Sequence, residues 1–171
     1  SRNVSSPTAT TAMLLTNVAV HEVDVIRWLL EEEIKSMSVN LTKVTSKANS
    51  KLSDPISVNC YTTSGVLATI DICANSTYGY EVGMEVITER ASLVVENLGD
   101  LTIIKDFYLP KRKSGKLHKD WMGRFKPAYI AELNAFVDSI KKRKLHPNFA
   151  TADDGLAASI ACGLGVRSLQ N

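Results

Sequence analysis

Residues 20–42 have the sequence VHEVDVIRWLLEEEIKSMSVNLT, and the spacing of their apolar residues changes within this stretch. Over roughly His21 to Glu32 the apolar residues recur at helical spacing, which predicts a short helix. From Ile34 onward apolar and polar residues alternate, with Met37 and Val39 on one side, which predicts a half-exposed strand. A helix that leads directly into such a strand indicates a domain that mixes helices and sheet.

The chain beyond this stretch contains more alternating segments, which short turn-like links separate. The links Thr63-Ser64-Gly65 and Leu98-Gly99-Asp100 are too short for the crossover that parallel strands need. We therefore expect neighbouring strands to be antiparallel. The predicted strands are Ile56 to Thr63, Val66 to Asn75, Glu81 to Glu89, Ala91 to Glu96 and Leu101 to Tyr108.

Two helices are predicted to close the chain, after a polar and basic loop over Pro110 to Asp120. The first is amphipathic from about Phe125 and ends in the basic run Lys141 to Lys144, whose cations complement a helix C-terminus. The second opens with Thr151 and Asp154, which are spaced as a capping box. The predicted fold class is α+β, an open and mostly antiparallel sheet with helices packed on one face.

Length and composition fit a soluble globular domain. The chain has 171 residues, of which 44% are hydrophobic and 22% charged, so it can bury a core and differs from disordered sequences. We expect residues 1–171 to form one domain. The formal net charge of +2 is too small to indicate nucleic acid or an anionic membrane as the main partner.

The cysteines and the start of the chain indicate the cellular compartment and whether the chain is part of a longer protein. Cys60, Cys73 and Cys162 are odd in number, lack CxxC spacing and lie in apolar stretches, which is typical of reduced thiols in the cytoplasm. No stretch approaches the roughly 18 apolar residues of a membrane span, and no basic-then-apolar leader is present. Ser1 to Ser5 run directly into structured-looking sequence, so we expect a piece of a longer cytoplasmic protein.

His21 is the first candidate for catalysis, since an imidazole is the usual proton acceptor near neutral pH. Its predicted place at a helix start would favour the neutral, basic form through the helix dipole. The alternative is a structural histidine satisfied by local hydrogen bonds. Glu22 and Asp24 beside it lack the second histidine of a zinc helix, so we predict no metal site and interpret them as partners of the helix dipole.

Three other motifs carry competing interpretations. The basic loop over Lys111 to Lys119 has no interleaved aromatics or glycine-rich cradle, so a solvated loop is favoured over a phosphate site. Tyr78 and Tyr80 could present hydroxyls to a sugar or form an ordinary strand-end cluster. Gly163-Leu164-Gly165 lies inside a predicted helix with no preceding strand, so it is not a dinucleotide fingerprint, and no nucleotide site is expected in this chain.

Four segments, taken in their order and spacing, carry a resemblance that spans nearly the whole chain. They are Ser1 to Asn3, Thr16 to Leu30, Tyr78 to Val82, and Trp121 to Glu132 followed by Asp153 to Ala158. Together they resemble the C-terminal domain of the glucose-fructose oxidoreductase / inositol dehydrogenase family (Gfo/Idh/MocA), and most closely its myo-inositol 2-dehydrogenase members.

The resemblance implies a two-domain dehydrogenase of which this chain is the substrate-binding and oligomerisation domain. A Rossmann domain upstream, absent from this chain, would hold NAD or NADP and a catalytic lysine, so the isolated chain is expected to be inactive. The full-length protein would be a homo-oligomer, a dimer or tetramer, assembled through the sheet. Its substrate would be myo-inositol or a related sugar or polyol.

The resemblance also assigns site residues. His21 would be the catalytic base, with Asn17 beside it, although family members typically have Asp at the position of Asn17. An Asn neither accepts a proton nor provides negative charge, but it can orient the ring or bind a hydroxyl. The predicted substrate-binding residues are Asn3, Tyr80, Trp121 and Tyr129.

The sequence is compatible with two functions from different classes. The leading hypothesis is an NAD(P)-dependent oxidoreductase that oxidises a secondary alcohol. The alternative, motivated by Asn17 and by the missing cofactor domain, is a non-catalytic ligand-binding or assembly module with the same fold.

Overall fold

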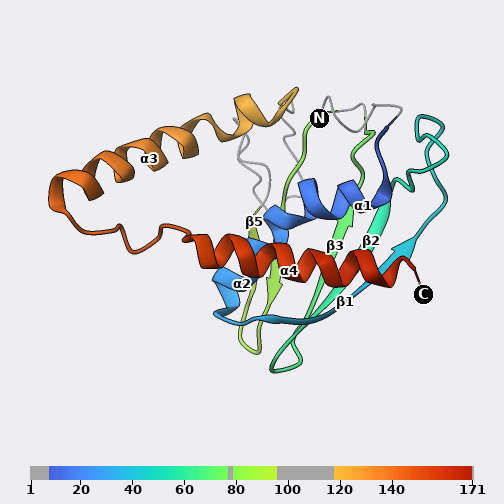
Figure 1. Ribbon diagram of the computed structural model, residues 1–171, viewed down its shortest axis with the longest axis horizontal. Helices are drawn as coiled ribbons and strands as arrows, with labels where there is room; N and C mark the ends of the chain where they lie inside the picture. Colours follow the sequence, from blue (N-terminus) through green and yellow to red (C-terminus); the bar gives the residue numbers. More distant parts are fainter. Residues whose placement is uncertain (1–7, 77–78, 96–117, 171) are drawn as a thin grey trace, which may run out of the picture. The chain divides into compact units, whose positions relative to one another are not determined.

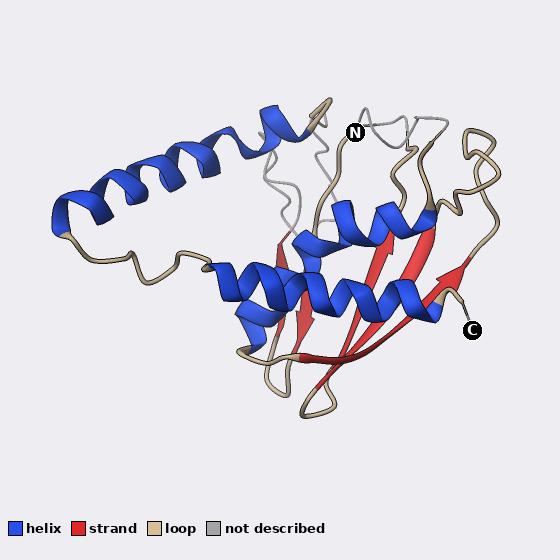
Figure 2. Cartoon of the chain, in the orientation of Figure 1, coloured by secondary structure: helices blue, strands red, loops and turns tan. Residues whose placement is uncertain are grey.

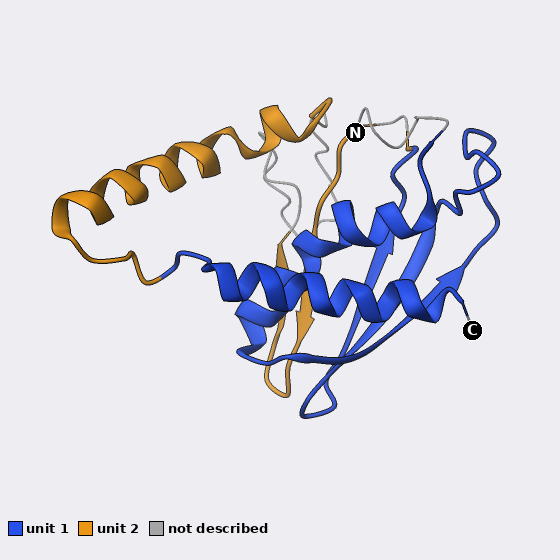
Figure 3. Ribbon diagram, in the orientation of Figure 1, with its two compact units in different colours: residues 1–75, 148–171 blue, residues 76–147 orange. Residues whose placement is uncertain are grey.

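The computed structural model describes residues 8–76, 79–95 and 118–170 (Figure 1). The chain divides into two compact units (Figure 3). Unit 1 comprises residues 1–75 and 148–171, and unit 2 comprises residues 76–147. Among the residues described, no helix is both long enough and apolar enough to cross a membrane.

Unit 1 begins with one continuous helical run made of three consecutive parts. They are α1 (Thr11–Leu14), the π-helix η1 (Leu15–Ala19) and α2 (Val20–Leu30). The Thr10 side chain caps the run by accepting a hydrogen bond from the Met13 N–H, and Glu31 ends it in the left-handed conformation, with φ of 53°. Because the junctions keep right-handed helical backbone, the run has its free N-terminus at Thr11.

A three-stranded antiparallel sheet follows the helical run, in the order β1-β2-β3. Its strands are β1 (Ile34–Leu41), β2 (Ile56–Thr62) and β3 (Leu67–Ile72). Met37 lies opposite Cys60, and Val58 opposite Ile70, so the register places buried side chains on a shared face. The alternation predicted from the sequence is therefore the alternation between core and outer face.

Helix α4 (Ala152–Ser168) covers the buried face of this sheet, and Figure 2 shows the helices of unit 1 layered over its strands. Its Thr151–Asp154 capping box is confirmed, with both reciprocal hydrogen bonds present. Small residues on one side of α4, namely Ala158, Ala161 and Gly165, are buried and let the helix approach β1 and η1 closely. The predicted α+β fold, an antiparallel sheet with helices on one face, is confirmed.

Unit 2 contains a hairpin and a long helix. The hairpin strands are β4 (Met84–Ile87) and β5 (Ser92–Val95), within the predicted segments, and α3 (Trp121–Lys142) starts four residues before the predicted Phe125 because Asp120 caps it. The Asp120 side chain accepts a hydrogen bond from the Gly123 N–H. The predicted strand over 101–108, and most of the predicted loop over 110–120, lie outside the described residues.

We predict that Gly165→Val destabilises the chain by about 1–3 kcal/mol, the usual cost of overpacking a core. A methyl group at this position would already lie 3.3 Å from Met37 Cε and 3.4 Å from Leu15 Cδ1. The measurement is the free energy of unfolding by urea. Gly163→Val is the matched control, because nothing lies within 4 Å of the corresponding position two residues earlier in the same helix. Equal stability of the two variants would contradict this account of the packing.

Candidate functional site

Asn17 and His21 lie four residues apart on the helical run, so their side chains share a face. Asn17 is the central residue of the π-helix η1, and both side chains are exposed. A π-helical turn holds an extra residue and widens the helix locally, and such turns are frequent at functional sites. The structure therefore brings together the two residues predicted to be catalytic and presents both to solvent.

The immediate surroundings of the pair leave the imidazole available. The Thr16 hydroxyl lies 3.3 Å from Asn17 Oδ1 and 3.3 Å from the Ala12 carbonyl oxygen, so it can orient the Asn17 amide. Within the described part of the chain, nothing hydrogen-bonds the ring of His21. Its nitrogens are thus open to a hydroxyl of a ligand.

The predicted helix-dipole effect on His21 is wrong. The sequence pattern placed this residue at the start of a helix, but the helical run starts at Thr11, and His21 lies in its middle. The backbone amides around His21 are therefore taken up by the preceding turns, and the positive end of the dipole lies about ten residues away.

Glu22 is a neighbour that the sequence interpretation underrated. Its Oε2 is buried and has no hydrogen-bond partner among the described residues. Burial raises the pKa of Glu22, and the backbone hydrogen bond and the charge of His21 oppose this shift only in part. The carboxyl also lies near α4, because its negative charge raises the pKa of Cys162 in that helix. Burial of the Cys162 thiol is the larger cause of the rise. Glu22 is thus a buried acid coupled electrostatically to His21, rather than a surface partner of the helix dipole.

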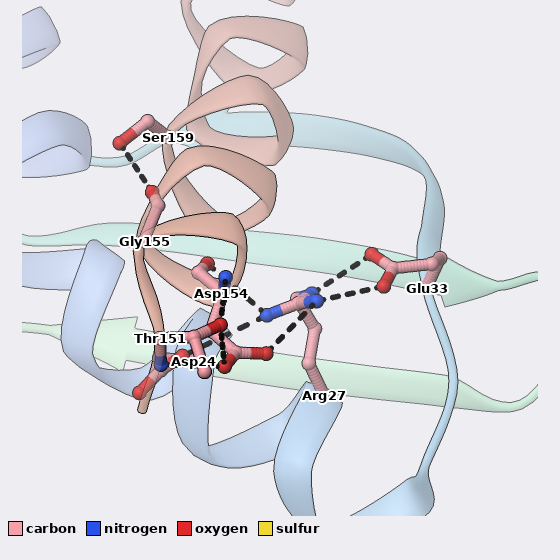
Figure 4. A network of polar contacts seen from close by, with 7 residues as sticks. All are labelled: Asp24, Arg27, Glu33, Thr151, Asp154, Gly155 and Ser159. Carbon is pink, nitrogen blue, oxygen red and sulfur yellow. Dashed lines mark hydrogen bonds and ion pairs between the residues drawn. The ribbon is translucent and has the colours of Figure 1, made fainter. Parts of the chain in front are cut away.

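Arg27 connects the helix that carries His21 to the rest of unit 1 through hydrogen bonds and ion pairs (Figure 4). Its side chain is only 9% exposed, and it forms a bidentate ion pair with Glu33, at 2.8 Å from Nε and 2.7 Å from Nη2. Nη1 donates to the Asp154 carbonyl oxygen at 3.2 Å, at the first turn of α4. The Asp24 and Asp154 carboxylates lie at 3.7 and 3.9 Å. Arg27 therefore joins α2, the start of β1 and α4.

The ion pairs of Arg27 shift the pKa values of the groups involved. Hydrogen bonds to Glu33 raise the pKa of Arg27, and the same bonds lower the pKa of Glu33. The pKa of Asp154 is lowered mainly by its hydrogen bonds with Thr151 in the capping box, with a smaller contribution from Arg27. All of these charges are consequently maintained at neutral pH.

Three of the four predicted substrate-binding residues lie in unit 2, where Trp121 pairs with Tyr129 and Tyr80 pairs with Phe125. The Trp121 and Tyr129 rings are 5.8 Å apart at an angle of 62°, and the Tyr80 ring meets that of Phe125 edge-on at 6.2 Å. The Arg124 guanidinium lies 5.0 Å from the Phe125 ring centre. The fourth residue, Asn3, lies outside the described residues, as does Tyr78.

Arg27 and His118 are residues of interest that the sequence analysis missed, and it interpreted Glu22 only as a partner of the helix dipole. Arg27 follows His21 by six residues, and only the fold reveals that its partners include Asp154, far along the chain. The backbone of His118 pairs with that of Tyr80 in an isolated antiparallel bridge.

Comparison with known proteins decides the family. Residues 3–94 match the family model of the GFO/IDH/MocA C-terminal domain. The chain belongs to this family. The domain is similar over 93% of its length to inositol 2-dehydrogenases of Klebsiella pneumoniae, at 34% identity, and Burkholderia multivorans, at 36% identity, and covers 45% of each of those proteins.

A solved structure similar to this GFO/IDH/MocA domain is that of myo-inositol dehydrogenase from Lactobacillus casei in complex with NAD(H) and myo-inositol. The TM-score is 0.83 at 28% identity, covering 97% of this chain and 48% of that one. The chain thus spans about half the length of the relatives that it matches.

We predict that Glu22 makes stability fall as pH rises above the ordinary glutamate pKa of 4.5. Because the folded-state pKa is raised, the native state holds the proton more tightly than the unfolded state does. The stabilisation is full below pH 4.5 and is lost as pH rises through the folded-state pKa. Glu22→Gln should therefore become progressively more stable than the wild type between pH 4 and pH 8, as measured by urea unfolding. The exposed Glu89→Gln is the control, and pH curves for Glu22→Gln that run parallel to those of the wild type would rule out this role.

Proposed function

We propose that this chain is the substrate-binding domain of an NAD(P)-dependent dehydrogenase that oxidises a secondary alcohol of myo-inositol or a related sugar or polyol. The observation that carries the proposal is the exposed Asn17–His21 pair at the π-turn, on a domain of the GFO/IDH/MocA family. Support comes from the inositol 2-dehydrogenase relatives and from the Lactobacillus casei structure, whose ligands are NAD(H) and myo-inositol.

The chemistry requires a base and a hydride acceptor at one CHOH group. NAD or NADP, when bound in the longer protein, would supply the acceptor for the hydride that leaves carbon. His21 takes the hydroxyl proton at a ring nitrogen as the C–O bond becomes a carbonyl. Asn17 donates or accepts a hydrogen bond beside the imidazole, but it neither carries charge nor takes the proton.

The remaining site residues would bind the other hydroxyls and the ring of the polyol. Tyr80 and Tyr129 can exchange hydrogen bonds with hydroxyls, and Trp121 offers an apolar surface to the C–H face of the ring. Asn3 is assigned to a further hydroxyl. Epimers differ only in the direction of a hydroxyl, so such a site discriminates by leaving polar groups unpaired with the wrong one.

The cofactor would be held mainly by a Rossmann domain in the longer protein. The residues described in this chain fit the substrate side of such a site, because the exposed imidazole has the donor and acceptor atoms for an alcohol. NAD and NADP both suit this assignment. None of Cys60, Cys73 and Cys162 forms a disulfide with another described residue, which supports a reducing cytoplasmic setting.

We further propose that copies of the full-length protein assemble into a dimer or tetramer through the outer face of the β1-β2-β3 sheet. The cross-strand rows Ser38–Asn59–Thr69 and Asn40–Ser57–Asp71 put small hydroxyl and amide side chains on this face, and Asp71 is their one charge. A sheet face that stays in water usually carries more charge than this. Uncharged groups able to exchange hydrogen bonds suit burial against a second copy.

We predict that His21→Ala lowers kcat for myo-inositol oxidation by the full-length protein by about a hundredfold or more, the usual effect of losing a general base. NADH formation at 340 nm is the readout, across a panel of polyols. The control is His146→Ala, because His146 is exposed in the segment after α3. A full-length wild type that oxidises no polyol would contradict the enzyme hypothesis and favour a non-catalytic module, and unchanged activity of His21→Ala would remove His21 from the mechanism.

We predict that Asn59→Lys shifts the full-length protein to a smaller oligomer, because it places a charge in the centre of the outer sheet face. Light scattering after gel filtration measures the mass. Ser46→Lys, in the loop between β1 and β2, is the control for added charge. A wild type that is monomeric at high concentration, or an Asn59→Lys variant of unchanged mass, would count against this face.

A further inference from the structure

We propose that His118 and Gly123 form a positioning pair that sets the fit of the polyol in the proposed site. The pair fixes the strand segment with Tyr80 against the first turn of α3, which begins with Trp121. This inference rests on the proposed function and deepens it by naming residues that control substrate affinity without contacting the reacting atoms.

The first contact joins two segments that are distant in the chain. The Tyr80 N–H donates to the His118 carbonyl oxygen at 2.8 Å, in the isolated antiparallel bridge between these residues. The Tyr80 ring meets the Phe125 ring edge-on. Tyr80 is thus held at its backbone by His118 and at its side chain by α3.

The second contact depends on the absence of a side chain at Gly123. A methyl group there would lie 3.1 Å from His118 Nδ1, and 3.9 and 4.0 Å from Cγ and Cε1 of the same ring. The imidazole therefore lies closer than a side chain at position 123 ordinarily allows, so any other residue type there requires the ring to shift by a few tenths of an ångström. No positive φ calls for glycine at this position, so close packing against His118 is the physical reason for its presence.

The first turn of α3 depends on this packing more than an ordinary helix start does. Asp120 accepts a hydrogen bond from the Gly123 N–H at 3.2 Å, but Pro127 has no N–H to donate to the Gly123 carbonyl. One backbone hydrogen bond of the early helix is therefore missing. Contacts of side chains, including that of His118, must help to set the direction of Trp121 and of its partner Tyr129, 5.8 Å away.

Small displacements of this pair should affect binding because polyol recognition depends on hydroxyl directions. Binding groups must be held to within about 0.5 Å of their productive positions. A methyl group at Gly123 has to push the imidazole by a few tenths of an ångström. That shift passes to Tyr80 through the backbone bridge and to Trp121 through the helix start.

The test compares Gly123→Ala with Gly155→Ala in the full-length protein, with myo-inositol and NAD. Both changes lie near the start of a helix, and nothing lies within 4 Å of the corresponding methyl position at Gly155. Gly123→Ala should raise the KM for myo-inositol about fivefold with little change in kcat, because a misplaced binding group weakens ground-state and transition-state binding alike. Gly155→Ala should leave both parameters unchanged.

Two further variants distinguish positioning from general destabilisation. In a His118→Ala background the space next to Gly123 is empty, so adding Gly123→Ala should cause no further rise in KM, and the double-mutant cycle should show coupling. Thermal unfolding should show that Gly123→Ala does not lower Tm, since Ala is the better helix former.

The outcomes separate this proposal from the proposed function. A wild type without turnover on any polyol overturns the proposed function, and the substrate role of the pair with it. An active wild type whose KM is unaffected by Gly123→Ala, or additive effects of the two substitutions, overturns the positioning pair alone.

Discussion

The buried guanidinium of Arg27 is the interaction on which the rest of unit 1 depends. A cation at 9% exposure requires compensation, and it receives carboxylates from three places in the chain together with a backbone carbonyl. Removing one of these partners would leave the Arg27 guanidinium with fewer groups to replace the water that it loses on burial. The arrangement therefore fixes the link from α2 to β1 and the position of the first turn of α4. It thereby also fixes the position of the helical run that presents Asn17 and His21.

Much of this architecture follows from sequence patterns because it depends on local periodicity. Alternation in β1 and β2, the capping box of Thr151 and Asp154, and the amphipathic α3 each reflect a single element and its own backbone geometry. The predicted helix over His21 to Glu32 agrees with α2 within two residues, but the pattern missed α1 and the π-helix before it, because residues 15–19 follow a π-helical period that no 3.6-residue pattern detects. The ion pairs of Arg27 also escaped prediction, since they join residues far apart in sequence.

The candidate site likewise combines residues that the sequence predicts with residues whose role only the structure reveals. His21 and Asn17 were found through a motif, and the structure adds that they share an exposed helical face. The role of Glu22 required knowledge of burial: the same carboxyl would be an ordinary charged group on a surface helix, but under α4 its pKa rises. The packing of His118 against Gly123 required a contact between residues whose spacing has no pattern of its own.

The π-turn at Leu15–Ala19 has one more consequence, which concerns insertions and deletions. Such a turn is equivalent to one extra residue in an α-helix, because the widened turn absorbs the roughly 100° of rotation that the residue would otherwise add. Deleting a residue within Leu15–Ala19 would therefore restore ordinary helix and leave the buried Leu14 and Val23 both facing the core. A deletion within α2 has no such turn to remove, and it would rotate Leu14 by that angle relative to the residues after the deletion. The π-turn is therefore the part of the helical run that best tolerates the loss of a residue.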